Sequence, residues 1–422
     1  MQNITYSERK GRLLRFLERH TKTDLTYLFG GGFWLVLDQV AGGLAALFLA
    51  IAFAHLVPKE VYGTYRYLLS AFWVLTAFTF TGLPTAMAQA VARGKEGTFR
   101  ESLRTSFFWS LPLSALALGA SGYYFLQGNA VVGSGFLSIA VIGPLIQPSS
   151  LFGSFLAAKK NFRALALTGT VFAAVPALAL FATMFLSTDP TAFLMAYLLG
   201  TAGAGAILTI YSFYRYRPNR VLDPEYKSLG KHFSAMNLLS TLAAQIDKIV
   251  VFHYLGAVEL AVYAFATAIP EQIRGALGSV SILAMPKFTS RPFAEIRANF
   301  WQRLWLYTGG LVLIAILYAI AAPYIFDIFF PTYHEAVFLS QLYVFALIPI
   351  GGSLSITLLQ AQEAKRELYI INIVTPAFQI VALIVLTATY GLIGAIIARI
   401  AGRIWSFVIS SIMLELYSRR KS

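Results

Sequence analysis

Eight ionisable residues interrupt long apolar stretches of this 422-residue chain, and they are its main candidates for chemistry. They are Asp38, Arg66, Asp247, Lys248, Glu271, Arg274, Arg399 and Arg403. An ionisable group inside a membrane-spanning stretch costs roughly 3 kcal/mol or more, so each one needs a functional or structural reason. Five of the eight are basic. This balance favours an anionic ligand over a cationic one.

The apolar stretch 259–285 carries polar groups on one face. At helical spacing this face holds Thr267, Glu271, Arg274, Gly278 and Ser281. Glu271 and Arg274 stand three residues apart, where helical side chains can pair. An arginine fork can also donate two hydrogen bonds to one phosphate. We therefore expect Arg274 to contact an anionic substrate; the alternative is a self-neutralised pair with Glu271 that only stabilises packing.

Two more groups of charges allow both kinds of role. Asp247 and Lys248 point about 100° apart on a helix, so we expect them to pair poorly with each other. They line a cavity wall, or else Asp247 pairs with an arginine of another helix. Arg399 and Arg403 lie one helical turn apart. They contact the phosphate of a lipid carrier, or they neutralise carboxylates and carbonyls within the helix packing.

Asp38 and Arg66 lie in the first two apolar stretches. Asp38 shares a face with the small residues Gly31 and Gly42, which allow close helix contacts. It is a candidate for cation or proton coupling, or a hydrogen-bonded carboxylate at a helix contact. Arg66 is a candidate substrate contact, or it extends its long side chain to the membrane interface.

Composition defines the elements that must position these groups. The chain is 58% hydrophobic and 12% charged, with a mean hydropathy of +0.67. A soluble core could not bury so much apolar surface, whereas a bilayer accommodates it. The absence of cysteine excludes disulfides, thiolate metal sites and cysteine nucleophiles. No nucleotide-binding or metal-binding motif is present, so we expect no cofactor and no metal.

Twelve apolar stretches follow residue 24, most of them near the roughly 20 residues needed to cross a bilayer. They are 27–56, 62–91, 107–127, 133–157, 164–186, 191–214, 233–255, 259–285, 302–329, 336–360, 369–389 and 391–416. The predicted fold is an all-α polytopic membrane protein of two six-helix lobes. Its parts are a basic amphipathic segment 1–24, an N-lobe 25–214, a linker 215–231, a C-lobe 232–417 and a tail 418–422.

The basic residues that give the net charge of +14 gather on one side of the predicted membrane. If the N-terminus is cytoplasmic, 27 of the 33 Lys and Arg residues fall in cytoplasmic segments and only Lys59 falls in an outer loop. Such a bias orients helical membrane proteins. We therefore expect a multi-pass protein of the cytoplasmic membrane with both termini inside, and no nucleic-acid partner.

The two halves also resemble each other. Pro144 and Pro176 are echoed by Pro349 and Pro376, at offsets of about 200 residues. Repeats of six helices keep the same orientation, so an axis along the membrane normal should relate the two lobes.

Specific motifs connect the chain to a known family. They are Tyr62-Gly-Thr-Tyr65, Phe80-Thr-Gly-Leu-Pro-Thr-Ala86, Asp247-Lys248, Tyr254-Leu-Gly256, Glu259 and Val262-Tyr-Ala-Phe-Ala266. With twelve spans in two lobes, the chain resembles the polysaccharide-biosynthesis (O-antigen flippase) proteins of the multidrug/oligosaccharidyl-lipid/polysaccharide exporter superfamily. It departs from them at Ala261, where a glycine is common.

The resemblance implies a function and partners. Such proteins move polyprenyl-pyrophosphate-linked oligosaccharides across the membrane through a cavity that opens to each side in turn, in some cases driven by an ion gradient. Implied partners are membrane lipids, the polyprenyl-linked saccharide and other membrane proteins of polysaccharide assembly. A multidrug and toxin extrusion antiporter is the first alternative. A membrane glycan polymerase or ligase is the second, although the short outer loops offer a poor active site.

Overall fold

A computed structural model describes residues 25–290 and 293–421, and this part of the chain is helical without strands. Within it, seven helices are long and apolar enough to cross a membrane, or eight if the bent pair Lys59–Phe78 and Leu83–Ala92 counts as one span. The described residues contain a helix at each of the twelve predicted stretches. The predicted amphipathic segment 1–24 lies outside the described residues.

The first bundle consists of the helices that precede residue 217. They are α2 (Leu25–Leu56), α3 (Lys59–Leu75), η1 (Thr76–Phe78), α4 (Leu83–Ala92), α5 (Gly97–Trp109), α6 (Leu111–Leu126), α7 (Ala130–Ser149), α8 (Leu151–Ala158), α9 (Phe162–Thr183) and α10 (Pro190–Tyr216). Several predicted stretches are broken into two helices. Between α3 and α4 the chain bends by 59°. Pro84 and Pro112 lie in the first turns of α4 and α6, where no backbone N–H is needed.

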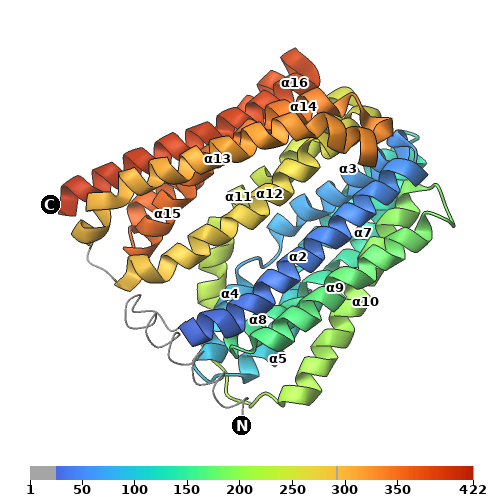
Figure 1. Ribbon diagram of the computed structural model, residues 1–422. Coiled ribbons are helices and arrows are strands. Elements are labelled where there is room, and N and C mark those ends of the chain that lie inside the picture. Colours follow the sequence, from blue (N-terminus) through green and yellow to red (C-terminus); the bar gives the residue numbers. More distant parts are fainter. Residues whose placement is uncertain (1–24, 291–292, 422) are drawn as a thin grey trace, which may run out of the picture.

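The second bundle consists of the helices that follow. They are α11 (Tyr226–Leu255), α12 (Ala257–Ser290), α13 (Phe293–Phe329), η2 (Pro331–Tyr333), α14 (Ala336–Tyr343), η3 (Val344–Gly351), α15 (Gly352–Ala361) and α16 (Lys365–Lys421). In Figure 1 the two bundles lie side by side, the first coloured blue to green and the second yellow to red.

Helix α16 is a tight hairpin. Its backbone reverses at Gly391, which has φ 60° and ψ −139°. A Cβ on Gly394 would lie 1.8 Å from the carbonyl oxygen of Leu386, so the two arms are in backbone contact there. Further along, the rings of Phe378 and Trp405 stack with centroids 4.9 Å apart. The predicted boundary between 369–389 and 391–416 is therefore confirmed.

The bundles pack closely at one end, which we call the junction end. The rings of Tyr67 on α3 and Phe252 on α11 stack with centroids 3.9 Å apart. A Cβ on Gly63 would lie 1.8 Å from the carbonyl oxygen of Ala257, so only glycine permits this approach of α3 to α12. Lys59 and Glu335 form an ion pair at 2.5 Å between the bundles.

The basic segments meet at the other end, the basic end. There Asp223, with a side chain only 2% exposed, binds Arg93 at 2.5 Å and Lys95 at 3.2 Å. Burial raises the pKa of this carboxyl, but the N–H of Glu225 and the two cations outweigh burial and hold the pKa below its ordinary value. Segment 215–225 is thereby fastened to the first bundle.

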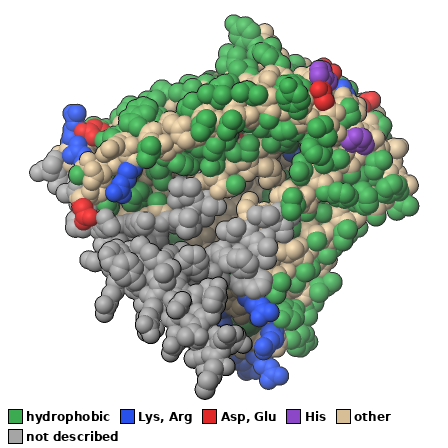
Figure 2. All heavy atoms as spheres, in the orientation of Figure 1, with side chains coloured by type: hydrophobic (Ala, Val, Ile, Leu, Met, Phe, Trp, Pro, Cys, Tyr) green, Lys and Arg blue, Asp and Glu red, His purple; other side chains and the backbone are tan. Residues whose placement is uncertain are grey.

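Figure 2 shows charged side chains near the two ends of this face and hydrophobic side chains between them. The same view shows the surface hollowed between the two bundles. An apolar band bounded by charged ends is the surface expected of a protein that spans a bilayer. The chain is a multi-pass membrane protein.

Candidate functional site

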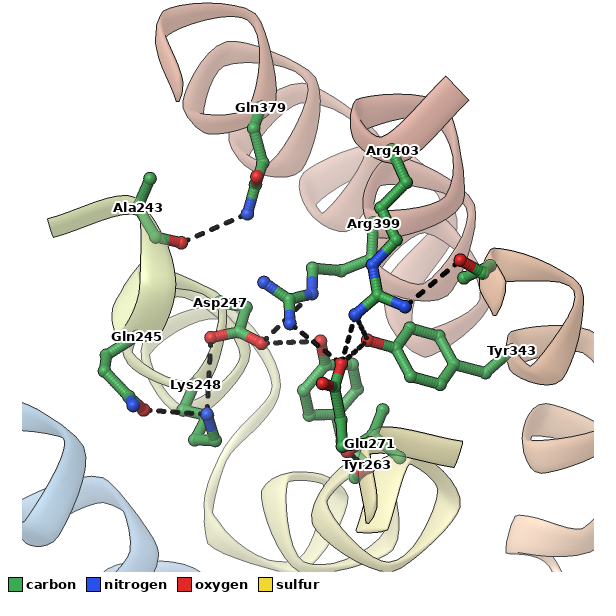
Figure 3. A network of polar contacts seen from close by, with 12 residues as sticks. Ala243, Gln245, Asp247, Lys248, Tyr263, Glu271, Tyr343, Gln379, Arg399 and Arg403 are labelled. Atoms are coloured by element: carbon green, nitrogen blue, oxygen red, sulfur yellow. Dashed lines mark hydrogen bonds and ion pairs between the residues drawn. The ribbon is translucent and has the colours of Figure 1, made fainter. Parts of the chain in front are cut away.

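Glu271 on α12 is the centre of a charged network within the second bundle (Figure 3). Its carboxylate accepts a hydrogen bond from Arg274 Nε at 2.5 Å and one from Arg399 Nη2 at 3.2 Å. Arg403 Nη2 and the hydroxyl of Tyr343 also donate to it. The predicted Glu271–Arg274 pair is confirmed, but it is one part of a larger cluster.

Asp247 on α11 is the second carboxylate of the network, and its side chain is 2% exposed. The hydroxyl of Tyr263 donates to its Oδ2 at 2.8 Å, and Arg399 Nε lies 3.6 Å from the same oxygen. Lys248 Nζ lies 3.6 Å from Oδ1 and donates to Gln245 Oε1 at 2.8 Å. We expected Asp247 and Lys248 to pair poorly; the long lysine side chain curls back and brings its charge within ion-pair range.

Arg399 connects the two carboxylates. Its side chain, 13% exposed, lies between Asp247 and Glu271 (Figure 3). The hairpin of α16 positions it, because the return arm carries Arg399 and Arg403 on successive turns. Arg403 also donates from Nη2 to the Tyr343 hydroxyl at 3.0 Å and from Nη1 to the carbonyl of Ala346 at 3.2 Å.

The network carries more positive than negative charge. Four cations (Lys248, Arg274, Arg399 and Arg403) contact two carboxylates (Asp247 and Glu271), which leaves an excess of two positive charges among these described residues. A net positive charge in a partly buried cluster attracts anions. The excess therefore favours an anion at this place.

A cavity of about 300 Å³ adjoins the network, because Arg274 and Arg403 belong to its lining. Ser353 and Ser406 line it as well. The side chain of Arg274 is 50% exposed, so it can move toward a ligand while Glu271 keeps its other donors. The two arginines and two hydroxyls can bind an anion with several oxygen atoms.

Arg66 lies in the first bundle, on α3. Its guanidinium carbon is 6.0 Å from the ring centre of Tyr62, and its Nε is buried without a hydrogen-bond partner. The ring of Tyr62 packs against that of Phe265 on α12 with centroids 5.0 Å apart, and Phe265 is two residues from Tyr263 of the network. Arg66 is thus partly buried near the network, but no ion pair with a described residue joins it to the network.

Asp38 lies on α2, and its side chain is outside the described residues. The neighbouring Gln39 places its Nε2 3.8 Å from where a Cβ on Gly275 would lie. The helix of Asp38 therefore passes close to α12 beside Arg274. The role of Asp38 in ion coupling therefore stays a prediction.

Sequence reasoning missed Tyr263 and Tyr343, whose hydroxyls bind the two carboxylates. A signal was available, because a tyrosine buried in an apolar helix needs a partner for its hydroxyl. The pattern of a single helix does not reveal that partner. Each of these two hydrogen bonds joins residues on different helices.

Two helical bundles with a charged network close to their contact define a class, the helical membrane transporters. The family described as "Polysaccharide biosynthesis protein" matches residues 28–290, more than half of the chain, and the protein belongs to this family. No curated protein matches the chain in sequence.

Solved structures share the fold at low identity. "Lipid II flippase MurJ, inward closed conformation" has a TM-score of 0.64 at 14% identity, covering 90% of this chain and 87% of its own. An "Inward-facing conformation of a multidrug resistance MATE family transporter of the MOP superfamily" has a TM-score of 0.67 at 15% identity, covering 90% and 94%. A "MOP superfamily transporter from Pyrococcus furiosus" has a TM-score of 0.57 at 14% identity, covering 93% and 94%. The predicted fold class is confirmed.

Proposed function

We propose that the protein moves a polyprenyl-pyrophosphate-linked oligosaccharide across the cytoplasmic membrane in polysaccharide biosynthesis. The observation that carries this proposal is the excess of two positive charges in the network around Glu271. A pyrophosphate supplies matching negative charge and oxygen atoms for the arginine forks. Membership of the polysaccharide biosynthesis family supports the same class of substrate.

The mechanism needs no bond chemistry. Arg274 and Arg403 contact the headgroup phosphates, and Ser353 and Ser406 hydrogen-bond to headgroup oxygens. The phosphate competes with Glu271 for these arginines, so binding loosens the cluster that holds α12 to α16. The polyprenyl tail stays in lipid, while the polar path shields the headgroup from hydrocarbon.

Alternating access would arise from movement of the two bundles relative to each other. In this proposal residues 25–214 and 232–417 move as lobes joined by the linker 215–231. The basic end faces the cytoplasm, as positive-inside orientation requires, and both termini lie there. The junction end is then the outer side, and its close packing corresponds to a state closed to the outside. Asp38 and Asp247 remain the candidates for coupling this cycle to an ion gradient.

The test uses purified protein in liposomes and a fluorescent polyprenyl-pyrophosphate oligosaccharide. Wild type is compared with Arg274→Gln and with Arg366→Gln, an exposed basic-end arginine that serves as the charge-matched control. We expect transbilayer movement to need the protein, to fall about tenfold in Arg274→Gln and to persist in the control, because one phosphate contact contributes about 1.4 kcal/mol. Equal rates in both variants would remove Arg274 from the substrate path.

A multidrug antiporter is the second candidate, favoured by the carboxylates Asp247 and Glu271 within apolar helices and by the structural likeness to the multidrug transporter. The same liposomes distinguish the two functions. Gradient-driven efflux of a cationic dye without movement of the lipid-linked saccharide would establish the antiporter and refute the flippase.

A further inference from the structure

A second basic site lies on the first bundle, in a groove between α9 and α10. The groove has a volume of about 600 Å³, and its lining among residues 25–290 and 293–421 comes from these two helices and from Asn161, the residue that caps α9. No described residue of the second bundle takes part. The groove is therefore separate from the network around Glu271.

The lining changes from charged to apolar in equal steps along the two antiparallel helices. The hydrogen bond from Asn161 to Tyr216 and the approach of Gly200 to Pro176 set the register of the two helices. In this register Arg163 and Arg215 lie at one level, Leu167 and Tyr211 at the next, and Val171 and Ile207 at the third, each one helical turn further from the basic end. From the first pair to the third, the chain advances eight residues on each helix, which is about 12 Å along the helix axes. Leu167, Val171 and Ile207 are about half exposed or more, so the apolar part faces the bilayer.

The charged part of the groove attracts anions. Arg163 lies in the first turn of α9, where the helix dipole also favours negative charge, and Arg215 lies on the neighbouring helix. Asn161 Nδ2 donates to the Tyr216 hydroxyl at 2.9 Å, which leaves the hydrogen of that hydroxyl available. Two arginines on neighbouring helices concentrate positive charge at this end of the groove.

We infer that this groove binds an anionic phospholipid of the bilayer leaflet at the basic end. Its phosphate lies between Arg163 and Arg215, and an acyl chain follows Leu167, Val171 and Ile207 toward the middle of the membrane. The positive charge of the two arginines suits the phosphate headgroup of such a lipid, and the apolar residues deeper in the membrane suit its acyl chain. The inference does not depend on the proposed substrate.

Native mass spectrometry of the purified protein tests this site. Phosphatidylglycerol and phosphatidylcholine of equal chain length are added, and the lipids retained per protein are counted. Each arginine near an anionic headgroup contributes about fivefold to binding, so Arg163→Gln/Arg215→Gln should weaken retention of one phosphatidylglycerol about 30-fold. The charge-matched control Lys365→Gln/Arg366→Gln, at the basic end of the second bundle, should retain it.

A second variant separates lipid binding from charge alone. Ile207→Trp leaves both arginines in place and fills the apolar part of the groove; since Ile207 is 69% exposed, the fold should tolerate the ring. We expect this variant to lose the same phosphatidylglycerol. Retention of that lipid by either groove variant, or equal retention of phosphatidylcholine by wild type, would overturn the inference. Displacement by a polyprenyl phosphate but not by phosphatidylglycerol would also overturn it, because the groove would then belong to the substrate.

Discussion

Glu271 holds three arginines, and this concentration of charge makes it the most sensitive residue of the network. Arg274, Arg399 and Arg403 all donate to its carboxylate. Replacing one member of a buried ion pair leaves the partner charge uncompensated, which commonly costs about 3 kcal/mol or more. Substitution of Glu271 therefore tests whether the network stabilises the fold or only binds a ligand.

We predict that Glu271→Gln lowers the free energy of unfolding by about 3 kcal/mol, because three guanidinium groups then surround a neutral amide. The double variant Glu271→Gln/Arg274→Gln should recover part of this loss. Thermal unfolding in detergent measures both. The control is Glu335→Gln, whose half-exposed pair with Lys59 should cost less than about 1 kcal/mol. Equal losses at the two glutamates would show that the network does not stabilise the second bundle.

At the scale of elements, the approach of α3 to α12 depends on Gly63. A side chain there would meet the backbone of Ala257, which has no rotamer by which to yield. Gly119 on α6 provides a contrast, since a Cβ at this glycine meets nothing within 4 Å. The two glycines share a helical context but differ in what surrounds them.

We predict that Gly63→Val opens the junction end, whereas Gly119→Val does not. The chain has no cysteine, so a thiol introduced by Phe265→Cys, at a ring that contacts Tyr62, reports opening specifically. Labelling of this thiol by a water-soluble maleimide should rise several-fold in the Gly63 variant only, because the residue is 2% exposed while the junction is closed. Unchanged labelling would mean that the helices separate elsewhere.

The linker is fastened by Asp223, and its attachment should depend on pH. A carboxyl whose pKa is lower in the folded state contributes stability above the unfolded value of 3.8, and this contribution is lost as the pH falls through the folded pKa. We therefore predict that segment 215–225 is protected from amide hydrogen exchange at pH 5 to 7 and loses this protection, measured against the intrinsic exchange rate at each pH, below pH 4. Asp223→Asn should show fast exchange already at pH 7. Slow exchange in this variant would assign the attachment to Asn219 and Thr98 instead.

Elements were easier to predict than the site. Spans of about 20 apolar residues mark helices without knowledge of their neighbours, and the boundary between 369–389 and 391–416 was predicted in this way. The pair Glu271–Arg274 was also predictable, because both residues lie on one helix. The approach of Arg399 to Asp247 was an open alternative, since it depends on how the α16 hairpin packs against α11. Distances between helices are set by packing, which helical periodicity alone does not encode.

At the scale of the whole molecule, the proposed cycle requires the bundles to part at the junction end. The Lys59–Glu335 pair joins them there. We predict that Lys59→Cys/Glu335→Cys, joined by a reducible thiol crosslinker, stops transport and that reduction restores it. Each single variant treated in the same way should keep transporting. Full activity of the crosslinked protein would show that the substrate crosses without separation of the bundles at this point.

The hairpin of α16 has a consequence for how the charged network changes. Arg399 and Arg403 share its return arm, and Gln379 on the outgoing arm donates to the carbonyl of Ala243 on α11. Because the two arms are in backbone contact near Gly394, we expect the hairpin to move as one unit about the turn at Gly391. A small rotation of this unit would withdraw both arginines from Glu271 together, so their two contacts would break and form as one event rather than independently.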